Sequence, residues 1–192
     1  MSILVVYESM WGNTKAVADA IARGLGPDTE VVEVTSAPAD IPTDLDLLVV
    51  GGPTHAFSMS RGTTRQDAAQ RGAPVGEESP GIRDWLAGLE PARLDSAGLL
   101  HGHPSPSERL GVATFDTRVA KVRKLPGSAA KAAAKEVRRR RLGHLVGTES
   151  FYVDGMSGPL LDGERERAQA WGEQLRRART ARRGDGSSVS GP

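Results

Sequence analysis

Short apolar runs alternate along the chain with stretches in which apolar residues recur every three or four positions. The first run, Ile3–Tyr7, is rich in residues that favour strands, and it ends abruptly at polar residues 8–14. Val17, Ile21 and Leu25 then recur at intervals of four residues. This pattern predicts a strand, a short polar loop and an amphipathic helix, which together make the first half of a βαβ unit.

The same alternation continues to the end of the chain. Further strands are predicted at 30–34, 46–52, 110–115 and 145–153, and further helices at 64–70, 82–89, 128–142 and 168–178. Strands separated by helices imply parallel pairing, so the predicted fold class is α/β, a doubly wound five-stranded parallel sheet in a single domain. We expect this domain to span residues 1–182 and the Gly- and Ser-rich tail, residues 183–192, to be disordered.

The loop after the first strand is a candidate site because ligands of doubly wound sheets bind at the carboxyl ends of the strands. It begins a helix, where backbone N–H groups lack partners and the helix dipole favours an anion. Its residues are Ser9, Met10, Trp11, Gly12, Asn13 and Thr14. They could hold a phosphate with neutral donors, or the polar side chains could merely cap the helix. Neither the dinucleotide-binding fingerprint nor a P-loop is present.

Two further loops are expected at the same edge of the sheet. Gly51 and Gly52 allow a close approach to the backbone, and the five residues after them offer one hydrogen-bonding ring and one apolar ring: Pro53, Thr54, His55, Ala56 and Phe57. The loop expected after the fourth strand carries Phe115, Asp116, Thr117 and Arg118, which could bind the edge of a planar ring.

Aromatic residues are concentrated in these loops. The chain has three Phe, three Trp and two Tyr, and three of these eight, Trp11, Phe57 and Phe115, fall in the three loops. Tyr7 closes the strand that leads into the first loop. A chain with few aromatic residues that places so many at one edge of its sheet is expected to bind a planar aromatic ligand.

The first loop resembles the phosphate-binding loop of the flavodoxin family, and residues 51–54 and 115–118 fall where that family has its two flavin-ring loops. The resemblance covers about residues 2–178. It implies a sheet in the order 2-1-3-4-5 and an FMN held without a covalent bond. By the same resemblance, residues 9–14 would bind the FMN phosphate, residues 53–57 would lie along one side of the isoalloxazine ring, and residues 115–118 would lie along its other side and its pyrimidine edge.

The resemblance implies an electron-transfer protein that carries electrons between a reductase and a redox acceptor. An FMN-dependent oxidoreductase, acting on a quinone or NAD(P)H or resembling a porphyrinogen oxidase, is the alternative. In that case the long segment 58–81 could cover the ring, with Arg61 and Arg65 reaching anionic groups of a substrate. A basic module that binds nucleic acid or a partner without flavin is a third hypothesis.

Charge is distributed unevenly along the sequence. The net charge is +1, yet residues 1–100 carry 7 Lys or Arg against 14 Asp or Glu, and residues 101–192 carry 18 against 10. Residues 118–141 hold ten Lys or Arg and Glu136 alone among acidic residues. No aromatic residue interrupts that stretch, which disfavours nucleic acid. We therefore expect the basic stretch to face an acidic redox partner.

Composition excludes several other classes of protein. The chain contains no cysteine, so disulfides, thiolate metal sites and cysteine nucleophiles are excluded. His101 and His103, without a nearby carboxylate, do not predict a metal site. No apolar run is long enough to span a membrane, and no secretory signal is evident, so we expect a cytoplasmic protein.

Overall fold

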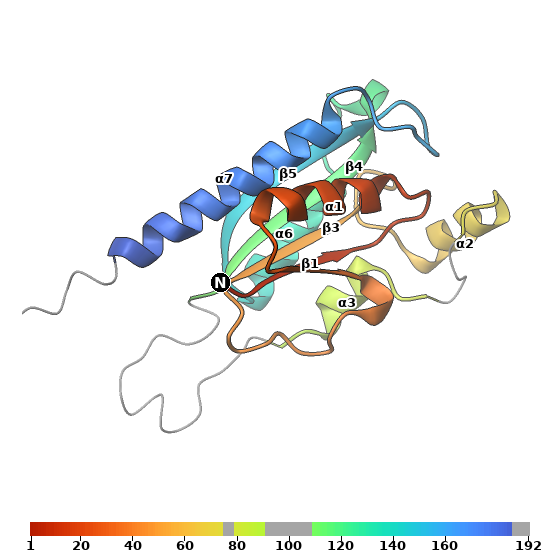
Figure 1. The fold of residues 1–192 in the computed structure, drawn as a ribbon. Coiled ribbons are helices and arrows are strands. Elements are labelled where there is room, and N and C mark those ends of the chain that lie inside the picture. Colours follow the sequence, from red (N-terminus) through yellow and green to blue (C-terminus); the bar gives the residue numbers. More distant parts are fainter. Residues whose placement is uncertain (75–78, 91–108, 186–192) are drawn as a thin grey trace, which may run out of the picture.

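The computed structural model describes residues 1–74, 79–90 and 109–185, and it contains a five-stranded parallel sheet in the order β2-β1-β3-β4-β5 (Figure 1). The predicted fold class and strand order are therefore confirmed. The strands are β1 (Ile3–Tyr7), β2 (Thr29–Glu33), β3 (Leu47–Pro53), β4 (Gly111–Val119) and β5 (His144–Val153). The α-helices are α1 (Asn13–Leu25), α2 (Gly62–Gln70), α3 (Ile82–Gly88), α6 (Ala129–Arg140) and α7 (Glu164–Asp185), and the short 3₁₀ turns are η1 (Val34–Ser36) and η2 (Ala120–Val122).

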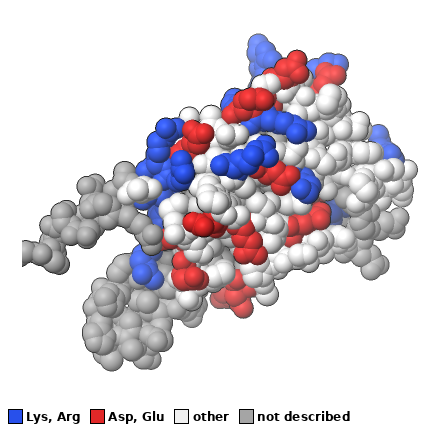
Figure 2. Space-filling model, viewed as in Figure 1, with Lys and Arg blue, Asp and Glu red and all other residues white. Residues whose placement is uncertain are grey.

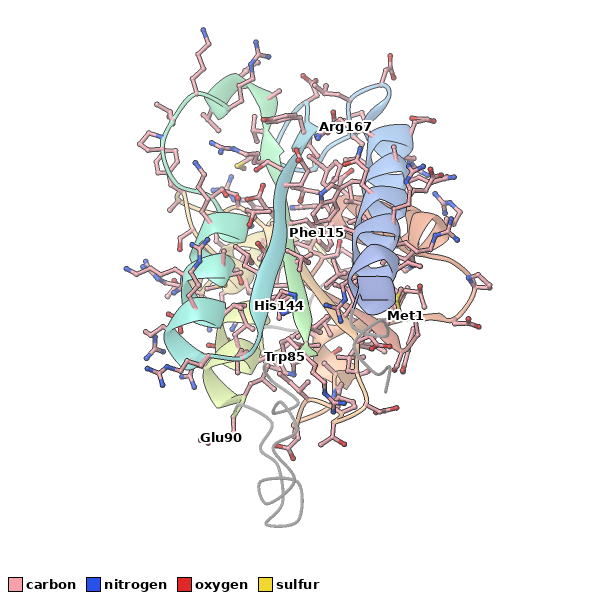
Figure 3. All side chains as sticks on the ribbon, turned by 90° about the vertical axis from the view of Figure 1, so that its left-hand side faces the viewer. Met1, Trp85, Glu90, Phe115, His144 and Arg167 are labelled. Atoms are coloured by element: carbon pink, nitrogen blue, oxygen red, sulfur yellow. The ribbon has the colours of Figure 1, made fainter. Side chains whose placement is uncertain are left out.

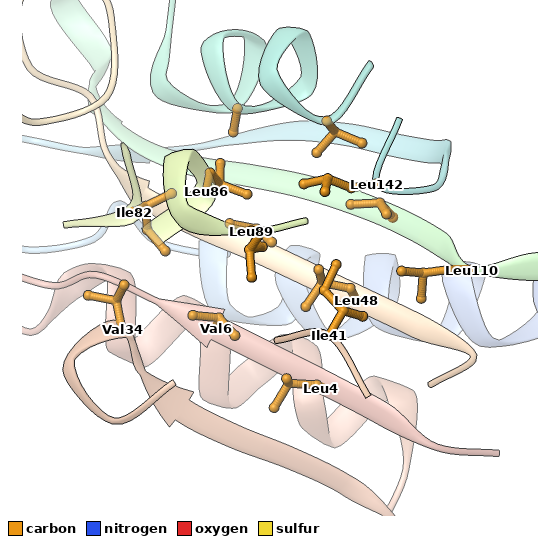
Figure 4. Close-up of a cluster of buried hydrophobic side chains, with 14 of the residues drawn as sticks. Leu4, Val6, Val34, Ile41, Leu48, Ile82, Leu86, Leu89, Leu110 and Leu142 are labelled. Carbon is orange, nitrogen blue, oxygen red and sulfur yellow. The ribbon is translucent and has the colours of Figure 1, made fainter. Parts of the chain in front are cut away.

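Helices cover both faces of the sheet, because β1, β3 and β4 are apolar on both sides. On one face α1 and α7 pack against side chains such as Val5, Val49 and Ala113. On the other face α3 and α6 cover Leu4, Val6 and Leu48, in the cluster drawn in Figure 4. Figure 3 shows the sheet edge-on, with α6 and α7 on opposite sides of β5.

Several predicted boundaries differ from the structure. β4 continues to Val119 instead of ending at Phe115, because it pairs with β3 as far as Pro53 and with β5 as far as Val153. The expected domain end at residue 182 falls inside α7, which continues to Asp185. Residues 186–192 of the predicted tail, like His101 and His103, lie outside the described residues.

Acidic and basic side chains are interspersed over the face that α1 and α7 cover (Figure 2). Lys15 pairs with Asp19 on α1, and Arg177 pairs with Glu173 on α7. The opposite net charges of the two halves of the sequence therefore do not separate into an acidic and a basic patch on this face. None of the helices in the described ranges is both long and apolar enough to cross a membrane.

Candidate functional site

An open cleft of about 660 Å³, solvent-facing space included, lies at the carboxyl edge of the sheet. The loops after β1, β3 and β5 and the end of β4 contribute its walls. The cleft is lined by Met10, Trp11, Asn13, Thr14, Pro53, Thr54, His55, Ala56, Thr117, Arg118, Val119, Val153 and Met156. Ten of the fifteen predicted site residues, Arg118 included, thus line the cleft together with Val119, Val153 and Met156.

The first loop forms one end of this cleft and leaves a helix N-terminus open. Gly12 adopts the left-handed conformation (φ 83°) that ends the loop, and the space beside its Cα is empty. The hydroxyl of Ser9 accepts hydrogen bonds from the N–H groups of Gly12 (3.1 Å) and Lys15 (3.3 Å). Four other amide N–H groups have no acceptor among the described residues: those of Met10, Trp11, Asn13 and Thr14. A loop of this kind is suited to bind an anion.

Met10 and Trp11 differ in how far they reach the cleft. Met10 is 2% exposed and packs against Ala68 and Ala73 beside α2, so that most of its side chain belongs to a small core cluster. Trp11 is half-buried at the edge of this cluster and lines the cleft. The indole ring is therefore the aromatic group of the first loop that a ligand could contact.

The N-terminus of α6 lies at the same edge of the sheet, but its amides are all satisfied. The Thr54 hydroxyl accepts from Ala129 N–H and the Asp116 carboxylate from Ala130 N–H, both at 2.8 Å, and the Ser128 hydroxyl accepts from the third amide. Asp116 is fully buried and does not line the cleft. The expectation that Asp116 lies in a ligand-binding loop is wrong, because its carboxylate caps α6.

Phe115 is also misplaced by the sequence analysis. Its ring is fully buried between the sheet and the α1/α7 layer (Figure 3), 6.3 Å from the ring of Phe151 in an edge-to-face pair. A Cβ atom on Gly51 would lie 2.1 Å from this ring. The glycine in β3 therefore admits the Phe115 side chain and not a ligand, and Phe115 belongs to the core.

Thr117 and Arg118 lie at the end of β4 and on opposite faces of the sheet. The Thr117 hydroxyl is 2.7 Å from the hydroxyl of Thr14 in a buried hydrogen bond, which ties β4 to the first turn of α1. Arg118 is 5% exposed, and its guanidinium donates to the carbonyl oxygens of Val122 (2.7 Å) and Leu125 (3.2 Å). It therefore holds the loop between β4 and α6 in place while part of its side chain lines the cleft.

The loop after β3 forms a tight turn over the cleft. The N–H and C=O groups of His55 and Ser58 bond to each other, and Ala56 (φ 45°) and Phe57 (φ 63°) between them are both left-handed. This conformation is uncommon for residues with side chains, above all for a bulky one. Pro53, Thr54, His55 and Ala56 line the cleft, whereas Phe57 is 48% exposed beyond it. Burial lowers the pKa of His55, and Asp67 opposes this in part, so the imidazole is neutral at pH 7.

A buried polar network fixes residues 60–65 and 82–84 against the end of β1. The Glu8 carboxylate, 5% exposed, accepts from the Ser60 hydroxyl (2.5 Å) and from Ile82 N–H (2.9 Å). Arg65 donates to Ser60 and pairs with Asp84 at 2.8 Å. Burial is the main reason why the pKa of Glu8 is raised. Since the Arg65 side chain is buried in this network, its predicted role of reaching a substrate is not supported, and Arg61 begins α2.

The sequence analysis missed the loop after β5. Asn13 donates to the carbonyl oxygen of Ser157 (2.9 Å), which brings this loop to the first turn of α1, and Met156 and Val153 line the cleft. The signal for a turn was present, because Gly158 and Pro159 follow the strand closely. The rule that places ligands at carboxyl ends of strands applies to β5 as well as to its neighbours. Groups of three or more potential metal ligands are absent from the described part of the chain.

Comparisons with known proteins bear on the fold alone. The sequence matches no protein-family model and no curated protein. Similar solved structures include a flavodoxin from the domain Archaea (17% identity, TM-score 0.57, 94% of this chain and 99% of that chain). A flavodoxin of Streptococcus pneumonia TIGR4 has 18% identity and a TM-score of 0.57 over 93% of this chain and 99% of that one. A flavodoxin, WrbA-like protein from Agrobacterium tumefaciens has 14% identity and a TM-score of 0.54 over 94% and 98%. The chain therefore has a flavodoxin-like fold.

Proposed function

We propose that the chain binds FMN without a covalent bond in the cleft at the carboxyl edge of the sheet and transfers electrons between a reductase and a redox acceptor. The observation that carries the proposal is the contrast between two helices that begin at this edge. Three side chains occupy the first amides of α6, whereas four amide N–H groups at the start of α1 have no acceptor among the described residues. An anion is the ligand that such a set of donors favours.

We expect the cleft beside these amides to hold the rest of the FMN molecule. Trp11 and Met156 offer apolar surfaces to a planar ring, and Val119 and Val153 extend the apolar wall. Thr54 and His55 place a hydroxyl and a neutral imidazole at the opposite side. When bound, FMN supplies the redox chemistry, and the chain binds it, orients it and sets the polarity around it.

The first experiment is the visible absorption spectrum of the purified protein, with any ligand released by heat and identified by chromatography. A yellow protein with one FMN per chain supports the proposal. If the protein is colourless, FMN is titrated into it and uptake is followed by quenching of flavin fluorescence. A protein that neither contains FMN nor takes it up contradicts the proposal.

Two glycines allow a matched test of the anion site. Gly12 and Gly72 are both left-handed (φ 83° and 88°), and both have empty space where a Cβ would stand. Gly12→Asp and Gly72→Asp therefore introduce similar strain and the same charge. We expect Gly12→Asp to weaken FMN binding at least about tenfold, which corresponds to ~1.4 kcal/mol, because its carboxylate meets the phosphate. Gly72→Asp is expected to bind FMN as the unchanged protein does, and equal losses in both variants contradict the assignment.

An FMN-dependent oxidoreductase is a second candidate, and His55 is the observation that favours it. A half-buried imidazole that is neutral at pH 7 and lines the cleft can accept a proton beside a bound substrate. Steady turnover of NADPH with a quinone by the FMN-loaded protein supports this candidate. Electron exchange with redox proteins in the absence of such turnover supports the electron carrier.

A further inference from the structure

Exposed apolar side chains gather around the cleft. The large apolar side chains that are exposed in the described residues are Met1, Phe57, Leu125, Met156 and Leu161. All but Met1 lie in loops that follow β3, β4 or β5 at the carboxyl edge of the sheet. Isolated exposed apolar residues are ordinary on a protein surface, but a group of them around one cleft marks an interaction site.

The loop between β4 and α6 (residues 120–128, the β4–α6 loop) adds positive charge beside these apolar residues. Lys121, Arg123 and Lys124 are exposed, and the loop contains no carboxylate. The loop also touches the turn after β3, because a Cβ on Gly127 would lie 2.7 Å from the carbonyl oxygen of Phe57. The bonds from the Arg118 guanidinium hold it in one conformation. The three cations are therefore placed on an ordered rim of the cleft.

Among the other cations of the basic stretch, Arg118 is buried at the cleft and Lys131 lies in the first turn of α6, whereas those at the end of α6 lie elsewhere. α6 begins at the carboxyl edge of the sheet, where the Asp116 carboxylate accepts from its second amide. It ends near the opposite edge, where the N–H of His144, at the start of β5, bonds to the carbonyl oxygen of Leu110. A helix of 12 residues is about 18 Å long. Arg138 and Arg141 are thus far from the cleft, and Arg139 and Arg140 pair with Glu136. The sequence places ten cations in one stretch, but the fold leaves Lys121, Arg123 and Lys124 beside the cleft.

We propose that the rim formed by the β4–α6 loop and the turn after β3 docks an acidic redox protein, with Lys121, Arg123 and Lys124 facing its carboxylates and Phe57 and Leu125 forming the apolar contact. This inference rests on the proposed function, since it names the partner class of the same site. Cations steer an acidic partner toward the rim, and the apolar contact brings the two redox centres close.

The test compares two variants that lose the same charge at different places. Lys121→Gln, Arg123→Gln and Lys124→Gln are combined in the rim variant. Lys135→Gln, Arg138→Gln and Arg141→Gln are combined in the control variant, which removes two exposed cations of α6 and the one that follows its end; none of the three forms an ion pair among the described residues. The probe is reduced plant-type ferredoxin, an acidic protein, and the measurement is the anaerobic rate at which it reduces the FMN-loaded protein at 20 to 500 mM salt. Oxidised cytochrome c, a basic protein that takes electrons from the reduced FMN-loaded protein, is the reference probe for docking of a partner of opposite charge.

We expect the rate with ferredoxin to fall as salt increases, and we expect the rim variant to react at least about tenfold more slowly at low salt and to lose most of its salt dependence. The control variant is expected to stay within about twofold of the unchanged protein. Equal effects of the two variants, or no effect of either, overturn the proposal, because the rim would then contribute only to the overall charge.

FMN uptake is measured separately for all three proteins, so that a failure of the proposed function is recognised before docking is judged. If FMN is not taken up, docking is measured as binding of ferredoxin to the ligand-free protein by isothermal titration calorimetry. Weaker binding by the rim variant alone supports the docking surface even then. Binding that is the same in all three proteins overturns it.

Discussion

Truncation of Phe115 separates the two roles that sequence and structure give to this residue. If its ring packs in the core as the structure places it, Phe115→Ala destabilises the fold without changing the cleft. The ring is fully buried, pairs with Phe151 and fills the space above Gly51. Removal of such a ring costs about 3–5 kcal/mol. For a chain of this size each kcal/mol lowers the melting temperature by ~2–4 °C, so the expected fall is roughly 6–20 °C.

The assay is urea unfolding of the ligand-free protein, since bound ligand would add its own stabilisation. FMN affinity is then measured by fluorescence at a temperature at which each variant is folded. Phe115→Leu, expected to cost about 1–2 kcal/mol, replaces Phe115→Ala if the latter does not fold. Phe57→Ala is the control, because this exposed side chain is expected to change the stability by less than ~0.5 kcal/mol. A Phe115 variant that keeps its stability and loses FMN affinity refutes the placement of this ring in the core.

Three further predictions concern the groups around the cleft. Burial raises the pKa of Glu8, so the folded state binds more protons than the unfolded state, and its stability falls as the pH rises from the ordinary carboxyl pKa through the raised one. The stability of Glu8→Gln relative to the unchanged protein should therefore increase from pH 4 to pH 8. Stability curves of the two proteins that run parallel over this pH range contradict the prediction. Burial lowers the pKa of His55, so its contribution to stability is present above about pH 6.5 and is lost as the pH falls; an NMR titration of its ring should give a midpoint below that of a free histidine. Thr14→Val and Thr117→Val each leave the hydroxyl of the other residue buried and unpaired, so each should lower the free energy of unfolding by ~1–3 kcal/mol, and the double variant should lose less than the sum of the two. Additive losses in urea unfolding would show that the two hydroxyls, 2.7 Å apart, do not stabilise the fold through their contact.

The sequence predicted the strands well where burial shows in the pattern, as in the apolar run of β3, but it misplaced the end of β4. The last part of β4 is polar, so the pattern placed a loop there. These polar side chains are buried with hydrogen-bond partners from other parts of the chain: Asp116 bonds to an amide of α6, Thr117 to Thr14, and Arg118 to two carbonyl oxygens of the loop that follows. None of these partners is adjacent in sequence to Asp116 or Thr117, so hydrophobic periodicity could not reveal them.

The candidate site was predicted in outline for a different reason. The first loop is a local motif, in which a strand, a glycine and a helix start follow each other directly, so its open amides could be expected from sequence. The wall formed by Val153 and Met156 could not, because apolar residues in a loop carry no chemical signature. Asn13 was also not predictable from its residue type, because its side-chain amide was expected to bind a ligand and instead donates to the carbonyl oxygen of Ser157.

Helices α1 and α6 both begin at the carboxyl edge of the sheet, and they show why residue types alone could not tell a side chain that caps a helix from one that binds a ligand. Thr54 and Asp116 reach α6 together because β3 and β4 are parallel neighbours in a register that sets Gly52 beside Asp116. Side chains from β3 and β4 thus replace a ligand at that helix. At α1 the corresponding positions are taken by Met10, which turns into the core, and by Ser9, whose hydroxyl already accepts two amides. The open amides of the first loop and the start of α1 belong to residues that line the cleft, and this is why we propose that an anion from outside the chain is their acceptor.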